Sequence, residues 1–184
     1  MGNVFKKQAT HNVFSWAGLG DIKTGRRSLG EEMPVFAYRL LEYTMLDVLC
    51  QEFGSEKANE LFRKSGYLAG AAIAEHALDC SKEMNEFVAA LQKYLKEQKI
   101  GILRIENLNE ATLNFTLTIG EDLDCSGLEA TGEVVCHYDE GFLEGIMETY
   151  TGKKFRVREI DCWANGDRVC RFQGSQVIAE GAEE

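Results

Sequence analysis

The chain has 184 residues, of which 45% are hydrophobic and 27% are charged, with a single proline. This composition is typical of one globular domain and excludes a fibrous or largely disordered protein. Twenty Lys and Arg residues against thirty Asp and Glu residues give a net charge of −10, which argues against nucleic acid as a partner because phosphate contacts require clustered cations.

The sequence also bears on where the protein works. No apolar run approaches the ~20 residues that a membrane-spanning helix requires, and the first residues contain no apolar stretch typical of a secretory signal. We therefore expect a cytoplasmic protein without a membrane span. In such a protein, cysteines are expected to be thiols or metal ligands rather than disulfides. The six cysteines are Cys50, Cys80, Cys125, Cys136, Cys162 and Cys170.

Three segments are expected along the chain. Residues 1–30 are polar and punctuated by glycine, with isolated apolar side chains such as Trp16. We interpret them as an arm that lies on the body or on a second subunit, and a disordered tail is the alternative. Residues 31–175 form the predicted folded domain, and residues 176–184 form an acidic, solvated tail.

The first long helix is predicted over residues 35–53, because Pro34 favours a helix start. Apolar side chains cover most of its circumference, and polar ones are confined to a stripe near Arg39, Glu42 and Asp47. A helix of this kind must be buried on more than one side. Either a dimer interface or an internal cavity would bury it.

A second helix is predicted over residues 56–78, and one of its faces carries almost no side chains. Gly66, Gly70 and Ala74 recur every four residues on that face. Glycine inside a helix costs about 0.5–1 kcal/mol relative to alanine, so the pattern indicates that something approaches the backbone closely. Another helix and a ligand are the two interpretations.

The remaining pattern predicts an α+β fold. An amphipathic helix is expected over residues 82–98 with Ser81 as its N-cap. Strands are expected at 102–106 and 112–119, a helix at 139–151, and a final hairpin at 154–162 and 169–173. Helices that are separated along the chain from paired strands predict an antiparallel four-stranded sheet packed with helices.

The final hairpin carries the most informative detail. Phe155 and Val157 share one strand face, whereas Ile160 and Cys162 have the opposite parity. An extra residue between these pairs, a β-bulge, would produce this slip, and it would bring Glu159 and Cys162 to the same face. A three-residue loop at 165–167 would then place Cys162 opposite Cys170.

These residues predict a metal site. Cys136 lies just before a predicted helix, where the helix dipole favours a thiolate. Together with Glu159, Cys162 and Cys170 it would form a closed set of four ligands, which suits zinc, with ferrous iron as the alternative. Such a site has no open position, so the metal would be structural. The competing interpretation is three buried thiols and a surface carboxylate.

The C-terminal third of the chain most clearly resembles the 4-vinyl-reductase domain. The resemblance lies in Cys136, in Glu159 and in the ending Cys162…Gly166-Asp167…Cys170-Arg171-Phe172. The resemblance covers about residues 30–174, including the glycine-rich segment at 66–70. That domain is also the sensor module of aromatic-responsive activators, where zinc is held by three Cys and one Glu. The resemblance therefore implies a zinc site at Cys136, Glu159, Cys162 and Cys170.

The resemblance also implies a fold similar to vesicle transport-particle subunits, a homodimer and an apolar pocket for a small hydrophobic molecule. Phenol-responsive sensors of this type hold the ligand hydroxyl with a His and a Trp, which this sequence does not place. The predicted pocket consists of Gly66, Gly70, Phe87, Phe115 and Leu117.

We therefore expect a non-catalytic, zinc-stabilised sensor domain for a hydrocarbon or aromatic ligand, which signals to a separate partner protein. One alternative is a reductase or an accessory protein in tetrapyrrole (bacteriochlorophyll) synthesis, although the chain lacks the G-x-G-x-x-G motif of a nicotinamide site. A structural or tethering subunit is a second alternative. A haem sensor is a third, with His11, His76 and His137 as the available imidazoles.

Overall fold

The structure, a computed structural model, describes residues 14–178 and divides into two compact units, one up to Glu32 and one from Met33 onward. In the first unit, a 3₁₀ turn at Trp16–Leu19 is capped by Ser15, and the short helix α1 (Ile22–Gly25) is capped by Asp21. Residues 1–13 of the predicted arm and 179–184 of the predicted tail lie outside the described residues. The predicted domain limits, residues 31 and 175, stay a prediction.

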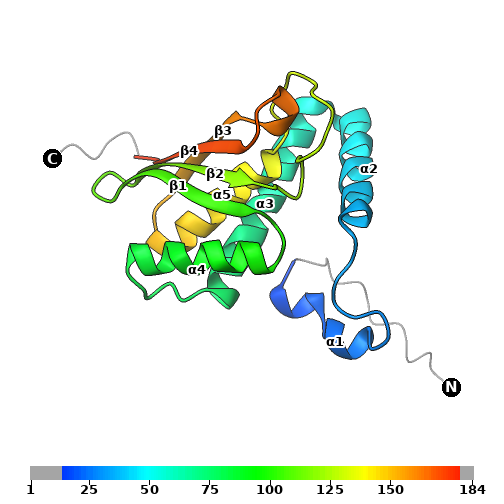
Figure 1. Cartoon of the computed structure of the whole chain (residues 1–184), viewed down its shortest axis with the longest axis horizontal. Helices are drawn as coiled ribbons and strands as arrows, with labels where there is room; N and C mark the ends of the chain where they lie inside the picture. The colour runs from blue at the N-terminus through cyan, green and yellow to red at the C-terminus, as the bar shows by residue number, and fades with distance from the viewer. Residues whose placement is uncertain (1–13, 179–184) are drawn as a thin grey trace. The chain divides into compact units, whose positions relative to one another are not determined.

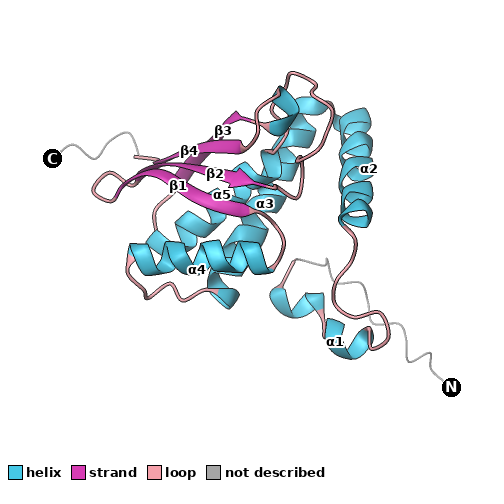
Figure 2. Ribbon diagram, viewed as in Figure 1, coloured by secondary structure: helices cyan, strands magenta, loops and turns pink. Residues whose placement is uncertain are grey.

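The second unit contains four longer helices and a four-stranded sheet (Figures 1 and 2). The helices are α2 (Val35–Phe53), α3 (Ser55–Ala77), α4 (Met84–Glu97) and α5 (His137–Thr151). The strands are β1 (Ile102–Asn109), β2 (Asn114–Gly120), β3 (Phe155–Asp161) and β4 (Cys170–Gln176). All neighbouring strands are antiparallel in the order β1-β2-β4-β3. This confirms the predicted α+β fold with an antiparallel sheet.

The hydrophobic core lies between one face of the sheet and the helices. Helix α4 contacts β1, α5 contacts β3, and α3 packs against α5. Strand β3 alternates strictly, with Phe155, Val157 and Glu159 buried and Arg156 and Arg158 exposed. On β3, the face of the sheet opposite the core therefore carries exposed, charged side chains.

The glycine face of α3 is explained by close helix packing. A Cβ atom on Gly66 or Gly70 would collide with the backbone carbonyl of Tyr138 or Phe142 in α5. The relation is reciprocal, since a Cβ on Gly141 or Gly145 of α5 would collide with backbone atoms of α3. The two helices therefore touch backbone to backbone, and the approaching group at this face is a helix.

The predicted β-bulge in the last hairpin is confirmed. The register between β3 and β4 shifts between Glu159 and Asp161, and the extra residue, Ile160, points outward with 40% of its surface exposed. The predicted three-residue loop is wrong, because β3 ends at Asp161 and β4 begins only at Cys170. A 3₁₀ turn at Trp163–Asn165 takes up the difference.

Two helices differ from expectation. Helix α4 starts at Met84, and Ser81 does not cap it because its hydroxyl donates to the carboxylate of Asp79. Helix α2 contains no buried residue, although its pattern predicted burial on more than one side. Within this single chain, Phe36 is 75% exposed and Leu41 is 60% exposed.

Candidate metal centre

Four thiols gather where the start of α5 meets the final hairpin. The sulfur atoms of Cys125, Cys136, Cys162 and Cys170 all lie within 4.8 Å of one another, and all four residues are buried. Cys136 is the N-cap residue of α5, and Cys162 and Cys170 flank the hairpin turn. The predicted residues Cys136, Cys162 and Cys170 thus lie together, and Cys125 joins them.

The spacing of the sulfurs resembles that of a tetrahedral zinc site. Zinc–sulfur bonds of about 2.3 Å place the sulfurs of a tetrahedron about 3.8 Å apart. The Cys136 sulfur lies 3.8 Å from that of Cys162 and 3.7 Å from that of Cys170. The Cys125 sulfur is closer to Cys170, at 3.0 Å. All six cysteines are free thiols, so a single ion could be ligated without breaking a disulfide.

Cys125 was missed by the sequence interpretation because it lies in the irregular loop between β2 and α5. The carboxylate of Asp122 shapes this loop: its Oδ1 accepts the backbone N–H of Asp124 at 2.9 Å and that of Cys125 at 3.1 Å. This turn directs Cys125 inward. The only sequence signal was a cysteine in the turn-forming run Asp122-Leu-Asp-Cys-Ser-Gly.

Glu159 lies beside the thiols and is 92% buried, with an exposed fraction of 8%. Its Oε2 accepts the backbone N–H of Cys136 at 3.0 Å, whereas its Oε1 has no hydrogen-bond partner. Burial, followed by repulsion from the sulfur of Cys162, raises the pKa of Glu159 to about 8. The regular alternation of β3 turns this carboxylate inward, and the bulge that follows it brings Cys162 to the same side.

The four clustered thiols shift one another's pKa values. The neighbouring thiols of Cys125, Cys162 and Cys170, and then burial, raise the pKa of Cys136 far above its usual value. The lowering of this pKa by the helix dipole stays a prediction. Hydrogen bonds from the surrounding thiols lower the pKa of Cys162.

A buried ion-pair network holds α5 against α3 and β3. Arg63 of α3 pairs with Glu140 and, at 2.7 Å, with Glu144 of α5, and it also donates to the backbone carbonyl of Val157. The two glutamates accept the backbone N–H groups of Glu159 and Val157 at 2.9 Å each. Because β3 is an edge strand, this network satisfies backbone groups that would otherwise be unpaired.

The five residues of the predicted apolar pocket do not all line one cavity in the structure. Phe87, Phe115 and Leu117 line a closed apolar cavity between α4, α5 and the sheet, with a volume of about 30 Å³. This space holds no more than one or two water molecules. Gly66 and Gly70 do not line it, since they lie against α5.

A larger cleft of about 200 Å³ lies between α2 and α3. Its walls are mostly apolar, and its polar groups are those of Tyr38, Glu42, Ser65 and Tyr138. Burial, and then repulsion from Asp124, raises the pKa of Glu42 to about 8, and its Oε2 has no hydrogen-bond partner. The cleft therefore combines apolar walls with a carboxyl group that favours the neutral form.

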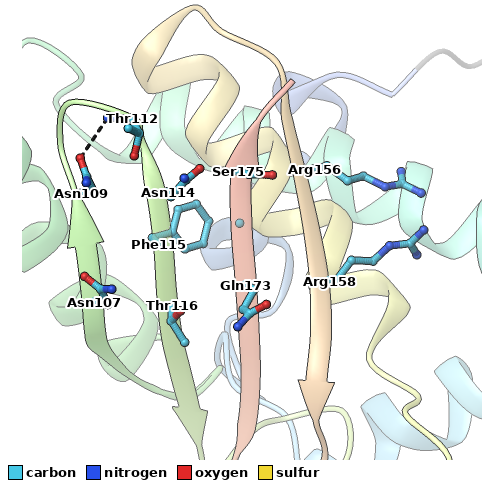
Figure 3. Close-up of a pocket in the computed structure, with 11 residues that line it drawn as sticks. Asn107, Asn109, Thr112, Asn114, Phe115, Thr116, Arg156, Arg158, Gln173 and Ser175 are labelled. Carbon is cyan, nitrogen blue, oxygen red and sulfur yellow. Dashed lines mark hydrogen bonds between the residues drawn. The ribbon is translucent and has the colours of Figure 1, made fainter. Parts of the chain in front are cut away.

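The open face of the sheet forms a shallow depression of about 510 Å³ (Figure 3). Figure 3 shows amide and hydroxyl side chains on three strands, with Arg156 and Arg158 side by side on β3. This surface is polar, so it does not match the predicted apolar pocket. Trp163 lies elsewhere, in the hairpin loop, where its Nε1 donates to the carbonyl of Leu128 at 3.1 Å. Within residues 14–178, none of the helices has the length and hydropathy needed to cross a bilayer.

Comparisons with known proteins connect this geometry to a family. Residues 115–176 match the model of the V4R domain. The uncharacterized protein MJ1642 of Methanocaldococcus jannaschii is 34% identical over 96 residues, which are 52% of this chain and 57% of the relative. The chain thus spans little more than half the length of that relative.

Three solved structures share the fold. The phenol-responsive sensory domain of the transcription activator PoxR, solved with phenol, has a TM-score of 0.61 at 17% identity, covering 80% of this chain and 76% of PoxR. A trafficking protein particle complex subunit 3 from Naegleria fowleri, covalently bound to palmitic acid, has a TM-score of 0.59 at 13% identity, covering 79% and 98%. A vinyl-4-reductase family protein from Methanocaldococcus jannaschii has a TM-score of 0.57 at 16% identity, covering 82% and 85%. The match of residues 115–176 to the V4R domain model, together with the shared fold, confirms the predicted resemblance of this chain to the 4-vinyl-reductase domain family.

Proposed function

We propose that this chain is a non-catalytic sensor domain that binds a small hydrophobic ligand and is stabilised by a structural zinc ion. The observation that carries the metal part is the cluster of four buried sulfurs, in which Cys136 lies at tetrahedral spacing from Cys162 and Cys170. Thiolate-rich sites prefer zinc, with ferrous iron as the alternative. Four protein ligands leave no open position for a substrate or water. When bound, the ion would cross-link the β2–α5 loop, the start of α5 and the hairpin.

Two residues are candidates for the fourth metal ligand. Cys136, Cys162 and Cys170 have two neighbours that could complete the set, Cys125 and Glu159. We propose Cys125, because its sulfur lies among the other three, whereas one carboxylate oxygen of Glu159 already accepts the backbone N–H of Cys136. Glu159 would then orient the N-cap residue as an outer partner of the metal site.

Metal analysis of the full-length purified chain tests this centre. We expect about one tightly held zinc per chain after dialysis, and a loss of thermal stability when a strong chelator removes it. Cys125→Ser should lose the ion, whereas Glu159→Gln should retain it with an affinity about 10–100-fold lower. Cys50→Ser, outside the cluster, is the matched control. A purified chain without bound metal would contradict the proposal, and retention by Cys125→Ser with loss by Glu159→Gln would instead identify the predicted three-Cys, one-Glu set.

For the ligand, we propose the cleft between α2 and α3 as the binding site. The closed cavity at Phe87 is too small for an aromatic molecule without rearrangement, whereas the cleft has about 200 Å³. Apolar walls with a few polar groups suit a hydrophobic ligand that carries one polar head. The ligands in the PoxR and trafficking-subunit structures, phenol and palmitic acid, support this class of ligand.

Native mass spectrometry with phenol, toluene and palmitic acid as probes tests the site. We expect at least one probe to bind the intact chain. Ser65→Trp should abolish binding by filling the cleft, because Ser65 is an exposed residue that lines it. Lys64→Trp, the exposed neighbour outside the cleft, should leave binding unchanged. Binding that survives in Ser65→Trp would move the site to another cavity.

We also propose a cytoplasmic homodimer that signals to a separate partner protein. Helix α2 exposes apolar side chains that water does not favour, and a second copy of the chain would cover them. These are Val35, Phe36, Leu40, Val48 and Phe53, whereas the exposed Leu41 and Met45 line the proposed ligand cleft. Light scattering of the purified chain should give a dimer mass, and Phe36→Asp should give a monomer. Free, metal-competent thiols require a reducing compartment, which supports the cytoplasm.

A further inference from the structure

Two buried carboxylates lie beside Cys136 in addition to the thiols. Oxygen atoms of Asp122 and Asp139 and the sulfur of Cys136 all lie within 4.8 Å of one another. Asp122 is 3% exposed and Asp139 is 5% exposed. Asp122 comes from the loop after β2 and Asp139 from the first turn of α5, so the fold brings together two acidic groups that are distant in sequence.

The hydrogen bonds around these carboxylates are incomplete. The Oδ2 atoms of Asp139 and of the neighbouring Asp124, which is also 5% exposed, are buried and have no hydrogen-bond partner. An acidic residue at the third position of a helix ordinarily accepts the backbone N–H of the N-cap residue. In α5 that N–H, from Cys136, donates to Glu159. The Asp139 oxygen is therefore left without the partner that its position would normally supply.

Within the described residues, no Lys, Arg or His forms an ion pair with Asp122 or Asp139, and of these three carboxylates the charge of Arg39 acts on Asp124 alone. Arg39 of α2 reaches the same loop, but its guanidinium donates to the carbonyl oxygens of Leu123 at 2.7 Å and Ser126 at 2.9 Å. Buried carboxylates without an ion pair are costly unless they are protonated or bind a metal. A proton shared between Asp122 and Asp139 is thus the competing explanation.

We propose that Asp122, Asp139 and Cys136 bind a second divalent metal ion, which shares the Cys136 thiolate with the first. This inference rests on the proposed zinc centre, because the shared thiolate belongs to it. Two carboxylates and one thiolate suit zinc or another ion of intermediate softness, whereas magnesium and calcium prefer oxygen ligands alone. The Oδ1 of Asp122 is held by two backbone N–H groups, so its other oxygen is oriented for a ligand role.

A zinc titration of the full-length, metal-depleted and reduced chain, followed by native mass spectrometry, tests the proposal. The wild type should bind one zinc tightly and a second more weakly. Asp139→Asn keeps the shape of the side chain and should weaken the second ion at least about 100-fold without changing the first. Asp124→Asn should weaken it about tenfold. Asp47→Asn, on the exposed part of α2, should bind two ions like the wild type.

Saturation of the wild type at one zinc, or an unchanged second ion in Asp139→Asn, would overturn the second site. Either result would leave the first centre intact, whereas a wild type that binds no zinc would contradict the proposed function itself. A cobalt titration of the wild type covers the case in which Asp139→Asn does not fold. The second equivalent should then lower the electron paramagnetic resonance signal per cobalt, because a bridging thiolate couples the two spins. A signal that simply doubles would rule out the shared thiolate.

Discussion

The backbone contact between α3 and α5 predicts that a single added methyl group is strongly destabilising. In Gly70→Ala, the new Cβ would lie 2.0 Å from the carbonyl oxygen of Phe142, whereas ordinary contacts begin at 3.4 Å. The helices would have to separate by about 1.4 Å at this point, or α5 would have to bend. The obstacle is backbone rather than a flexible side chain, so it cannot rotate away.

The magnitude follows from two opposing effects. Alanine favours a helix over glycine by about 0.5–1 kcal/mol, and overpacking a rigid contact costs about 1–3 kcal/mol, occasionally more. Since the clash at Gly70 is with backbone, the cost should lie at the upper end of that range. We therefore expect a net loss of about 2 kcal/mol in the free energy of unfolding, which is about 4–8 °C in Tm for a chain of this size.

Thermal unfolding of the zinc-loaded chain, followed by circular dichroism, measures this loss. Gly120→Ala is the matched control, because its Cβ would meet its nearest neighbour, a side-chain atom of Val169, at an ordinary 3.7 Å. Gly66→Ala adds a second readout. Its clash is with Tyr138, two residues after the proposed ligand Cys136, so zinc affinity should fall together with stability. A Gly70→Ala chain as stable as the wild type would refute the packing argument.

Three further predictions concern other buried groups. Arg63→Ala should cost about 3 kcal/mol in the free energy of unfolding by urea. It removes the main cation from the buried carboxylates of Glu140 and Glu144, which would keep only the more distant His137 and Arg156 at 3.4 Å and 3.9 Å. A loss below about 1 kcal/mol would show that the network is dispensable. The pKa of Glu42 is raised to about 8 by burial and then by Asp124, so the stability that its neutral form supplies is greatest below about pH 4 and is lost as the pH rises toward 8. Between pH 6 and pH 8, we expect the free energy of unfolding of the wild type to fall by about 1 kcal/mol more than that of Glu42→Gln, since this side chain is only half-buried. If the free energies of unfolding of the two proteins changed in parallel with pH, the raised pKa of Glu42 would be disproved. Phe87→Ala should cost about 3–5 kcal/mol, because Phe87 is 1% exposed and stacks on Tyr150 with ring centroids 3.9 Å apart; a chain that unfolds at the wild-type urea concentration would contradict this.

The sequence pattern was sufficient for most of the second unit, because the deciding interactions are local. Strand alternation and helical periodicity depend on residues only two to four positions apart, so the order of elements and the antiparallel sheet could be predicted. The parity slip around Ile160 predicted the bulge for the same reason. The hairpin loop could not be predicted, because the 3₁₀ turn is held by contacts with a distant loop, such as the 3.1 Å hydrogen bond from Trp163 to the carbonyl of Leu128.

In the candidate site, too, residues next to regular elements could be predicted, whereas a residue in an irregular loop could not. Cys136, Cys162 and Cys170 adjoin regular elements, so their convergence followed from helix and strand positions. Cys125 lies in a loop whose course depends on the Asp122 turn and on contacts with α2, and spacing alone carries no information about it. The glycines of α3 show the opposite case. Their spacing correctly indicated a close approach, but only the fold of the whole chain identifies α5 as the approaching group.

The proposed ligand cleft and the proposed metal centre are joined through one loop. Tyr38, which lines the cleft, donates its hydroxyl to Asp124 at 2.9 Å, and Tyr43 of the same helix donates to the Asp124 carbonyl at 3.1 Å. Asp124 directly precedes Cys125, the proposed ligand. A molecule that enters the cleft and displaces α2 must therefore either break these hydrogen bonds or move the loop with it. The proposed metal would cross-link this loop to the start of α5 and to the hairpin, so a displacement of α2 without the loop would have to break the two tyrosine hydrogen bonds.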